Sequence, residues 1–157
     1  MNIHFIQAGG TIDKHYPRNP DNHGYNFAVG KPAFFDVLSR AGYLMNVTHS
    51  IACQKDSLDM TDEDRRVVSM HVRGAESDHI IITHGTDTIL KTAEAILAFV
   101  GRAKVIILTG AMMPAGFRNS DADFNLGMAV AAVQILPPGV YIALDGKVVP
   151  WHEYVPT

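Results

Sequence analysis

Three consecutive isoleucines at residues 80–82 constrain the fold more than any other part of the chain. A run of β-branched apolar residues without alternation is typical of a strand that is buried on both faces, as in a parallel sheet. A turn at residues 83–85 follows, and it brings Thr86 and Asp87 to the start of the next helix. The sequence therefore predicts a strand, a tight turn and a helix, with polar side chains at the turn.

An earlier segment has the same design. Residues 3–8 are predicted to form a strand, and Gly9, Gly10 and Thr11 follow it directly. In open α/β sheets, ligands bind beyond the carboxyl ends of the strands, where such turns lie. We therefore expect Thr11 and Thr86 to face one crevice. Two hydroxyls and a carboxylate in one crevice suggest acyl transfer with a threonine nucleophile.

The rest of the chain alternates strands with helices, which predicts an α/β fold with an open, mostly parallel sheet and helices on both faces. Further strands are expected at 43–53, 105–108 and 140–144, and helices at 32–41, 61–74, 89–100 and 120–136. Thr61 is the expected N-cap of its helix. Asp145 and Gly146 predict a hairpin turn into a last short strand at 147–149. A length of 157 residues suits a single domain, residues 1–157.

Composition excludes several classes of function. The chain is 47% hydrophobic and 18% charged, as ordinary globular proteins are, and its apolar runs are too short to span a bilayer. The net charge of -3 provides no general attraction to nucleic acid or to anionic lipid. A single cysteine excludes an intrachain disulfide framework, and the first residues do not resemble a secretory signal. We expect a cytoplasmic protein that binds neither nucleic acid nor membranes.

Several residues of the two turns also have a purely structural interpretation. Gly9 and Gly10 fit a tight turn as well as the close approach of a ligand to the backbone. Thr11 by itself would be interpreted as a helix cap. Asp87 is either the N-cap of the following helix or the partner of a substrate ammonium group, and these two interpretations are compatible.

A third polar cluster, Asp56 and Ser57, follows the strand expected at 43–53. Alone it would indicate a turn, but at the same edge of the sheet it is a candidate for substrate binding. His84 is expected to shape the backbone of its turn rather than to carry a proton. The eight histidines show no metal-ligand spacing, and neither the dinucleotide fingerprint nor a P-loop occurs. No metal or cofactor is predicted.

The sequence contains four motifs whose order along the chain resembles that of the bacterial-type L-asparaginase family. They are Gly-Gly-Thr-Ile at 9–12, Asp-Ser-Leu-Asp-Met-Thr at 56–61, Thr-His-Gly-Thr-Asp-Thr at 83–88 and Leu-Thr-Gly-Ala-Met at 108–112. The resemblance extends over nearly the whole chain, up to the strand at Val140. Typical members carry a second, C-terminal domain, so the chain resembles the N-terminal, flavodoxin-like domain and the short single-domain members.

The resemblance implies that the side-chain amide of L-asparagine is hydrolysed to L-aspartate and ammonia without a cofactor. Thr11 matches the nucleophile that forms the acyl-enzyme, and Thr86 matches the second essential threonine. Ser57 matches a ligand of the α-carboxylate of the substrate, and Asp87 matches a ligand of its α-ammonium group. The backbone of Ala111 matches a position that faces the substrate amide.

Gly10 and Gly85, in the two turns, complete the expected substrate-binding set. The long segment between residues 13 and 30 is expected to be a lid or a binding loop. Phe27 stands on it where long members have a tyrosine that assists the first threonine. Tyr16 and Tyr25, on the same segment, are candidates for that role, although neither is in register.

Two further positions depart from the family pattern. Leu58 replaces the glutamine of the periplasmic-type members. The family lysine that pairs with the second threonine falls in register near residues 156–157, and no lysine follows Lys147. Either the chain stops just before that lysine or its activity is impaired. The alternative function is therefore a weak or inactive asparaginase-like protein that binds an amino acid or its amide. Long members build each site between two subunits, which implies a homodimer or a larger assembly.

Overall fold

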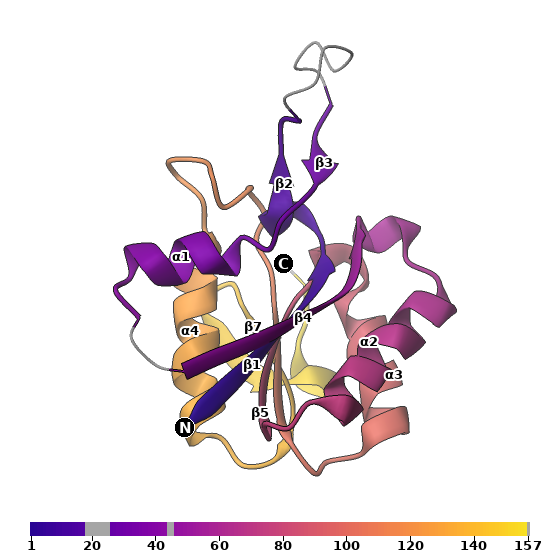
Figure 1. Cartoon of the computed structure of the whole chain (residues 1–157). Coiled ribbons are helices and arrows are strands. Elements are labelled where there is room, and N and C mark those ends of the chain that lie inside the picture. The colour runs from indigo at the N-terminus through magenta and orange to yellow at the C-terminus, as the bar shows by residue number, and fades with distance from the viewer. Residues whose placement is uncertain (18–25, 44–45, 157) are drawn as a thin grey trace.

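The computed structural model describes residues 1–17, 26–43 and 46–156, and the candidate lid residue Tyr25 lies outside this part of the chain. Its centre is a six-stranded sheet in the order β4-β1-β5-β6-β7-β8 (Figure 1). Five strands run parallel to one another: β1 (Asn2–Gly9), β4 (Asn46–Lys55), β5 (His79–Thr83), β6 (Val105–Thr109) and β7 (Gly139–Leu144). The last strand, β8 (Lys147–Pro150), pairs with β7 in the antiparallel direction. This is the flavodoxin-like strand order, with the predicted C-terminal hairpin added.

Helices cover both faces of the sheet, as predicted. The helices α1 (Phe34–Arg40) and α4 (Ala122–Ile135) enclose one apolar core with the sheet. The helices α2 (Asp62–Gly74) and α3 (Ile89–Val100) enclose the other. Ile81 belongs to the first core, whereas Ile80 and Ile82 belong to the second. Because successive side chains point to opposite faces of a strand, the unbroken isoleucine run is what a strand between two cores requires.

Local signals place the ends of several elements. Thr61 caps α2, as predicted: its hydroxyl accepts a hydrogen bond from the Asp64 nitrogen, and the Asp64 carboxylate accepts one from the Thr61 nitrogen. In contrast, β4 runs from Asn46 to Lys55, two residues beyond the predicted end. No helix in the described ranges is long and apolar enough to cross a membrane.

The segment between residues 13 and 30, expected to be a loop, begins and ends as a two-stranded ribbon. The strand β2 (Lys14–His15) pairs with β3 (Ala28–Val29) in the antiparallel direction. Figure 1 shows this ribbon projecting away from the main sheet, beyond the end of β1. The ribbon was not predicted, because two-residue strands carry no periodicity and their pairing joins residues far apart in the sequence.

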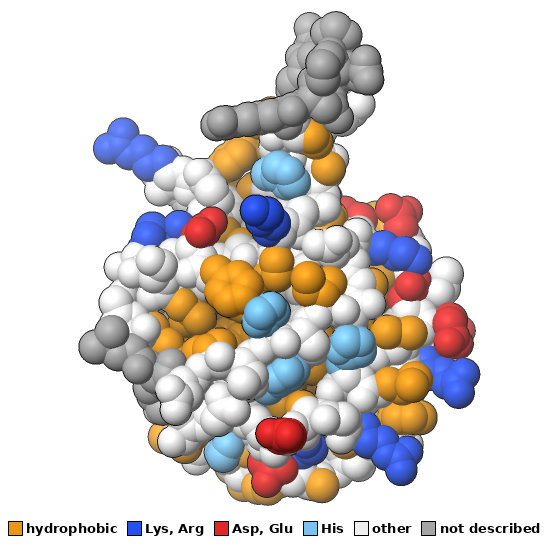
Figure 2. All heavy atoms as spheres, in the orientation of Figure 1, with side chains coloured by type: hydrophobic (Ala, Val, Ile, Leu, Met, Phe, Trp, Pro, Cys, Tyr) orange, Lys and Arg blue, Asp and Glu red, His pale blue; other side chains and the backbone are white. Residues whose placement is uncertain are grey.

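The edge strand β4 is more exposed than the central strands. Histidines gather there beside apolar side chains, as Figure 2 shows. His4 shares hydrogen bonds with the hydroxyls of Thr48 and Ser50, at 2.8 Å and 3.0 Å, and His71 bonds to Ser50 at 2.8 Å. The hydrogen bonds of these two histidines therefore link β1 and α2 to β4.

Candidate active site

The candidate site lies where the strand order reverses direction. β1 pairs with β4 on one side and with β5 on the other, so the chain winds away from β1 in both directions. Ligands of open α/β sheets bind at this switch point, outside the carboxyl ends of the strands. Two single-turn 3₁₀ helices begin there: η1 (Thr11–Asp13) after β1 and η3 (Thr86–Thr88) after β5.

The two turns touch through their glycines. Gly10 has a φ of 88°, and a methyl group placed on it would overlap the backbone nitrogen of Gly85. The Gly10 nitrogen also donates a hydrogen bond to the carbonyl of Lys55, at 2.9 Å. Gly10 is therefore required by the backbone, since a side chain has no room and the φ disfavours one. Thr11 and Thr86 each follow one of the two touching glycines, so the structure brings their turns together.

Ser57 lies against the same contact. It opens the 3₁₀ helix η2 (Ser57–Asp59) after β4, and a methyl group on Gly85 would lie 2.6 Å from the Ser57 Oγ. The Ser57 side chain is 1% exposed, and its Oγ makes no hydrogen bond with any described residue. A buried hydroxyl without a partner costs free energy, so a ligand group that bonded to it would recover that cost.

Asp87 stands at the exposed rim of the site. The helix α3 begins at Ile89 with Thr88 at the N-cap position, where no side chain caps it. The interpretation of Asp87 as the N-cap was therefore wrong, because an extra 3₁₀ turn separates it from the helix. Its carboxylate makes no hydrogen bond or ion pair within the described residues and is free to meet a cation.

Ala111 is buried in the loop after β6, and this loop packs on the β5 turn. A methyl group on Gly110 would overlap the His84 carbonyl oxygen and lie 3.7 Å from the Thr86 Cγ2. The Thr86 hydroxyl contacts the sulfur of Met112 at 3.7 Å. The loop that carries Ala111 therefore packs against the turn that carries Gly85 and Thr86.

Asp121, at the N-cap position of α4, holds this loop. Its carboxylate accepts hydrogen bonds from the Met112 nitrogen, at 3.0 Å and 3.1 Å, and from the Met113 nitrogen at 3.1 Å. Asn125 joins the same carboxylate, at 2.9 Å, to the Gly110 carbonyl, at 3.1 Å. Sequence reasoning placed Asp121 only at the start of a helix and missed this role, since its partners depend on how the loop folds back.

His84 is completely buried and shapes the turn, as expected. Its Nδ1 lies 2.7 Å from the Gly85 carbonyl oxygen, and its Nε2 lies 2.7 Å from the Thr92 hydroxyl. Burial lowers the pKa of the imidazole to about 4, so the ring is neutral at pH 7. With both nitrogens occupied, His84 fixes the position of Gly85 and does not act as a base.

Aromatic contacts tie the β2–β3 ribbon to the rest of the molecule. Tyr16 stacks on Phe27 with 4.1 Å between ring centroids, and Phe27 lies 5.7 Å from Phe117 in the loop before α4. Tyr16 is 49% exposed. Tyr16 therefore shares one aromatic cluster with the residue in the family tyrosine register.

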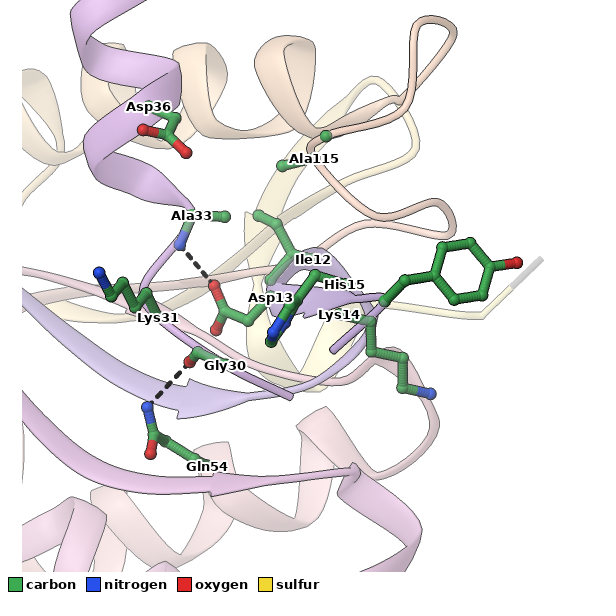
Figure 3. A pocket seen from close by; sticks show the side chains of 12 residues that line it. Ile12, Asp13, Lys14, His15, Gly30, Lys31, Ala33, Asp36, Gln54 and Ala115 are labelled. Atoms are coloured by element: carbon green, nitrogen blue, oxygen red, sulfur yellow. Dashed lines mark hydrogen bonds between the residues drawn. The ribbon is translucent and has the colours of Figure 1, made fainter. Parts of the chain in front are cut away.

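A cavity of about 700 Å³ opens beside η1, on the side of the ribbon and α1 (Figure 3). Asp13 lies at its wall, and its carboxylate accepts hydrogen bonds from the Ala33 nitrogen, at 2.7 Å, and from Gln7, at 2.9 Å. Burial raises the pKa of Asp13 to about 6. Neither Thr11 nor Thr86 lines this cavity. Nothing in the local sequence indicates that Asp13 is buried.

Residues 2–153 match the family model described as the N-terminal part of asparaginase. The chain belongs to the asparaginase family. It is 39% identical over 155 residues to an L-asparaginase of Thermococcus kodakarensis, a match that covers 94% of this chain and 45% of the relative. It is 31% identical over 135 residues to a glutaminase-asparaginase of Acinetobacter glutaminasificans, covering 83% of this chain and 41% of that protein.

Solved asparaginase structures share the fold. A Campylobacter jejuni protein described as a probable cytoplasmic L-asparaginase superposes with a TM-score of 0.78 and 27% sequence identity. That superposition covers 98% of this chain and 49% of the other. The chain therefore spans less than half the length of each of these proteins.

Proposed function

We propose that this chain hydrolyses the side-chain amide of L-asparagine to L-aspartate and ammonia, with Thr11 as the nucleophile. One observation carries the proposal: Gly10 and Gly85 touch, so the turns of Thr11 and Thr86 meet at the switch point of the sheet. Membership of the asparaginase family supports the same reaction.

In the proposed mechanism, the Thr11 hydroxyl oxygen attacks the amide carbon of the substrate. The hydroxyl proton passes to the amide nitrogen, the carbon–nitrogen bond breaks, and ammonia leaves an aspartyl ester on Thr11. Water then attacks the ester, which releases L-aspartate and restores the hydroxyl. The backbone of Gly85 and Ala111 would face the amide group of the substrate. The Gly10 nitrogen is already bonded to the Lys55 carbonyl, so Gly10 serves the close contact between the two turns.

The α-amino-acid end of the substrate is assigned to Ser57 and Asp87. The Ser57 hydroxyl, which has no partner among the described residues, would donate to the α-carboxylate, and the exposed Asp87 carboxylate would attract the α-ammonium group. Opposite charges within a few ångströms favour both ionised forms. Discrimination between asparagine and glutamine rests on a single methylene group, which is worth only about 1–3 kcal/mol.

Ammonia release from L-asparagine tests the proposal, with Thr11→Ala and Thr86→Ala measured beside the unaltered chain. Loss of a nucleophile commonly lowers kcat by about 10⁴ or more. Thr48→Ala is the matched control, because Thr48 is an exposed threonine on β4 and pairs with His4 at the start of β1. Unchanged rates in both site variants would refute the assignment.

A binding protein without turnover is the second candidate. Phe27 favours it, because this ring has no hydroxyl and is held between Tyr16 and Phe117. Calorimetric titration with L-aspartate, run beside the ammonia assay, separates the two functions. Binding without ammonia release supports the second candidate, and no binding at millimolar ligand removes it.

Assembly into a homodimer or larger oligomer, in the cytoplasm, is part of the proposal. A rim of exposed apolar side chains lies just after β2 and on the loop between β6 and α4: Tyr16 is 49% exposed, Met112 68% and Phe117 39%. Such a rim is typical of surfaces that a partner covers. A monomeric mass by light scattering at micromolar concentration would contradict the assembly.

A further inference from the structure

A buried arginine connects the two loops that carry Ser57 and Asp87. Arg65 belongs to α2 and is only 6% exposed. Its Nη1 donates a hydrogen bond to the Met60 carbonyl, at 3.1 Å, just after η2. Its Nη2 donates to the Thr88 hydroxyl, at 3.2 Å, in η3. One guanidinium group therefore holds the end of one loop and the end of the other.

The Thr88 hydroxyl is the central atom of this connection. It accepts from Arg65 and donates its own hydrogen to the Ser57 carbonyl oxygen, at 2.8 Å. Thr88 directly follows Asp87, and Ser57 is held on its other side by Gly85. The separation between the Ser57 and Asp87 side chains therefore depends on the Gly85 contact and on the Thr88 hydroxyl, which Arg65 orients.

We propose that Arg65, acting through the hydroxyl of Thr88, is a positioning residue that fixes the spacing of Ser57 and Asp87 and so sets the affinity for the α-amino-acid end of the substrate. The inference rests on the proposed function. Arg65 has no hydrogen bond to Thr11 or Thr86 among the described residues, so it governs ligand affinity and not the attack on the amide.

The ion pair that Arg65 forms contributes little to the stability of the fold. Its carboxylate partner, Asp62, lies 3.3 Å away and is fully exposed, and such pairs contribute little to stability. Burying a guanidinium group costs free energy unless its donors are satisfied, and the Arg65 Nε makes no hydrogen bond within the described residues. The hydrogen bonds to Met60 and Thr88 are therefore the contacts that satisfy this buried guanidinium group.

Thr88→Val is the most informative variant, because valine keeps the shape of threonine and removes both hydrogen bonds. Thr88→Ser restores the hydroxyl. Arg65→Met removes the guanidinium group, and Arg66→Met is its matched control: Arg66 is the next residue of α2, and its described ion pair is with the exposed Glu63. For each variant, the dissociation constant of L-aspartate, kcat and KM for L-asparagine, and the melting temperature are measured.

We expect Thr88→Val and Arg65→Met each to raise the dissociation constant and KM about tenfold, as loss of one charged hydrogen bond does, with kcat changed less than about twofold. The double variant is expected to be no worse than either single variant, because both remove the same connection. Thr88→Ser and Arg66→Met are expected to match the unaltered chain.

The outcomes separate the inference from the function on which it rests. If the unaltered chain binds L-aspartate and Thr88→Val binds it equally well, the positioning role is overturned and the proposed function stands. Additive effects in the double variant, or a loss confined to kcat, also overturn it. If the unaltered chain neither binds nor hydrolyses, both proposals fail. If Arg65→Met does not fold, the comparison of Thr88→Val with Thr88→Ser tests the positioning role.

Discussion

At the scale of single residues, the site depends most directly on the absence of a side chain at Gly10. Its φ of 88° and its contact with Gly85 leave no space for a side chain. We expect Gly10→Ala to lower the free energy of unfolding by at least about 2 kcal/mol and to abolish ammonia release, since the strained turn must move away from Gly85.

Gly127→Ala is the matched control for this substitution. Gly127 lies within α4, and a methyl group there meets open space. Alanine is favoured over glycine inside helices, so this variant is expected to gain about 0.5–1 kcal/mol. Urea unfolding measures both variants, and equal free energies of unfolding would contradict the close contact between the two turns.

The buried His84 predicts a pH dependence of stability. Its pKa is lowered by burial from an ordinary 6.5 to about 4, so the unfolded chain binds the proton more readily than the folded chain does. The stabilisation that this provides is complete above pH 6.5 and is lost as the pH falls toward 4. Over this shift it amounts to about 3 kcal/mol.

Asp13 acts in the opposite direction over nearly the same range. Burial raises its pKa from 3.8 to about 6, so its contribution to stability is complete below pH 3.8 and is lost as the pH rises through 6. We expect His84→Gln to remove only the first effect, and the stability difference from the unaltered chain to grow by about 3 kcal/mol between pH 4 and 6.5. Denaturant titrations at several pH values measure it. A constant difference would show that His84 is not neutral and buried.

At this scale, the sequence predicts which residues lie in the turns better than it predicts their hydrogen-bond partners. The turns at Thr11 and Thr86 follow from strand runs and glycines, which are local signals. The bond between Arg65 and Thr88 spans 23 positions and depends on how α2 packs beside η3. No periodicity or motif announces such a contact.

At the scale of elements, the long strands and helices were predicted because each is covered by a core on one or both faces. The β2–β3 ribbon was missed because its strands have two residues each. The orientation of the loop after β6 was missed as well, since Asp121 fixes it through partners at positions 112, 113 and 125.

Asp121→Ala is expected to loosen this loop. It leaves the nitrogens of Met112 and Met113 without their acceptor, and we expect a loss of about 1–3 kcal/mol in unfolding free energy together with slower ammonia release. Asp123→Ala is the matched control, because Asp123 lies in the first turn of the same helix and pairs with Arg40 at the surface. If the two variants behave alike, Asp121 does not hold the loop.

At the scale of the whole molecule, the two apolar cores share one sheet. Ile81 faces one core and Ile82 the other, so neither core can separate without breaking β5. We therefore predict that residues 1–157 unfold as one cooperative domain, with equal calorimetric and van't Hoff enthalpies. Two resolved transitions in a calorimetric scan would mean that the cores unfold separately.

The strand order was predictable only in part. Alternating strands and helices indicate a parallel sheet, but they do not say which strands are neighbours. The adjacency of β1 and β5, on which the site depends, was not predicted as such: the similar turns predicted only that Thr11 and Thr86 face one crevice, and the structure places the two strands side by side.

The proposed reaction depends above all on Thr11 as the carrier of the acyl group. To test this assignment, the chain is mixed with L-asparagine and quenched with acid, and the modified peptide is mapped by mass spectrometry. We predict an aspartyl ester on the peptide that contains Thr11, and none in Thr11→Ala. Release of ammonia with the ester on the Thr86 peptide, or from the Thr11→Ala variant at an unchanged rate, would contradict the assignment.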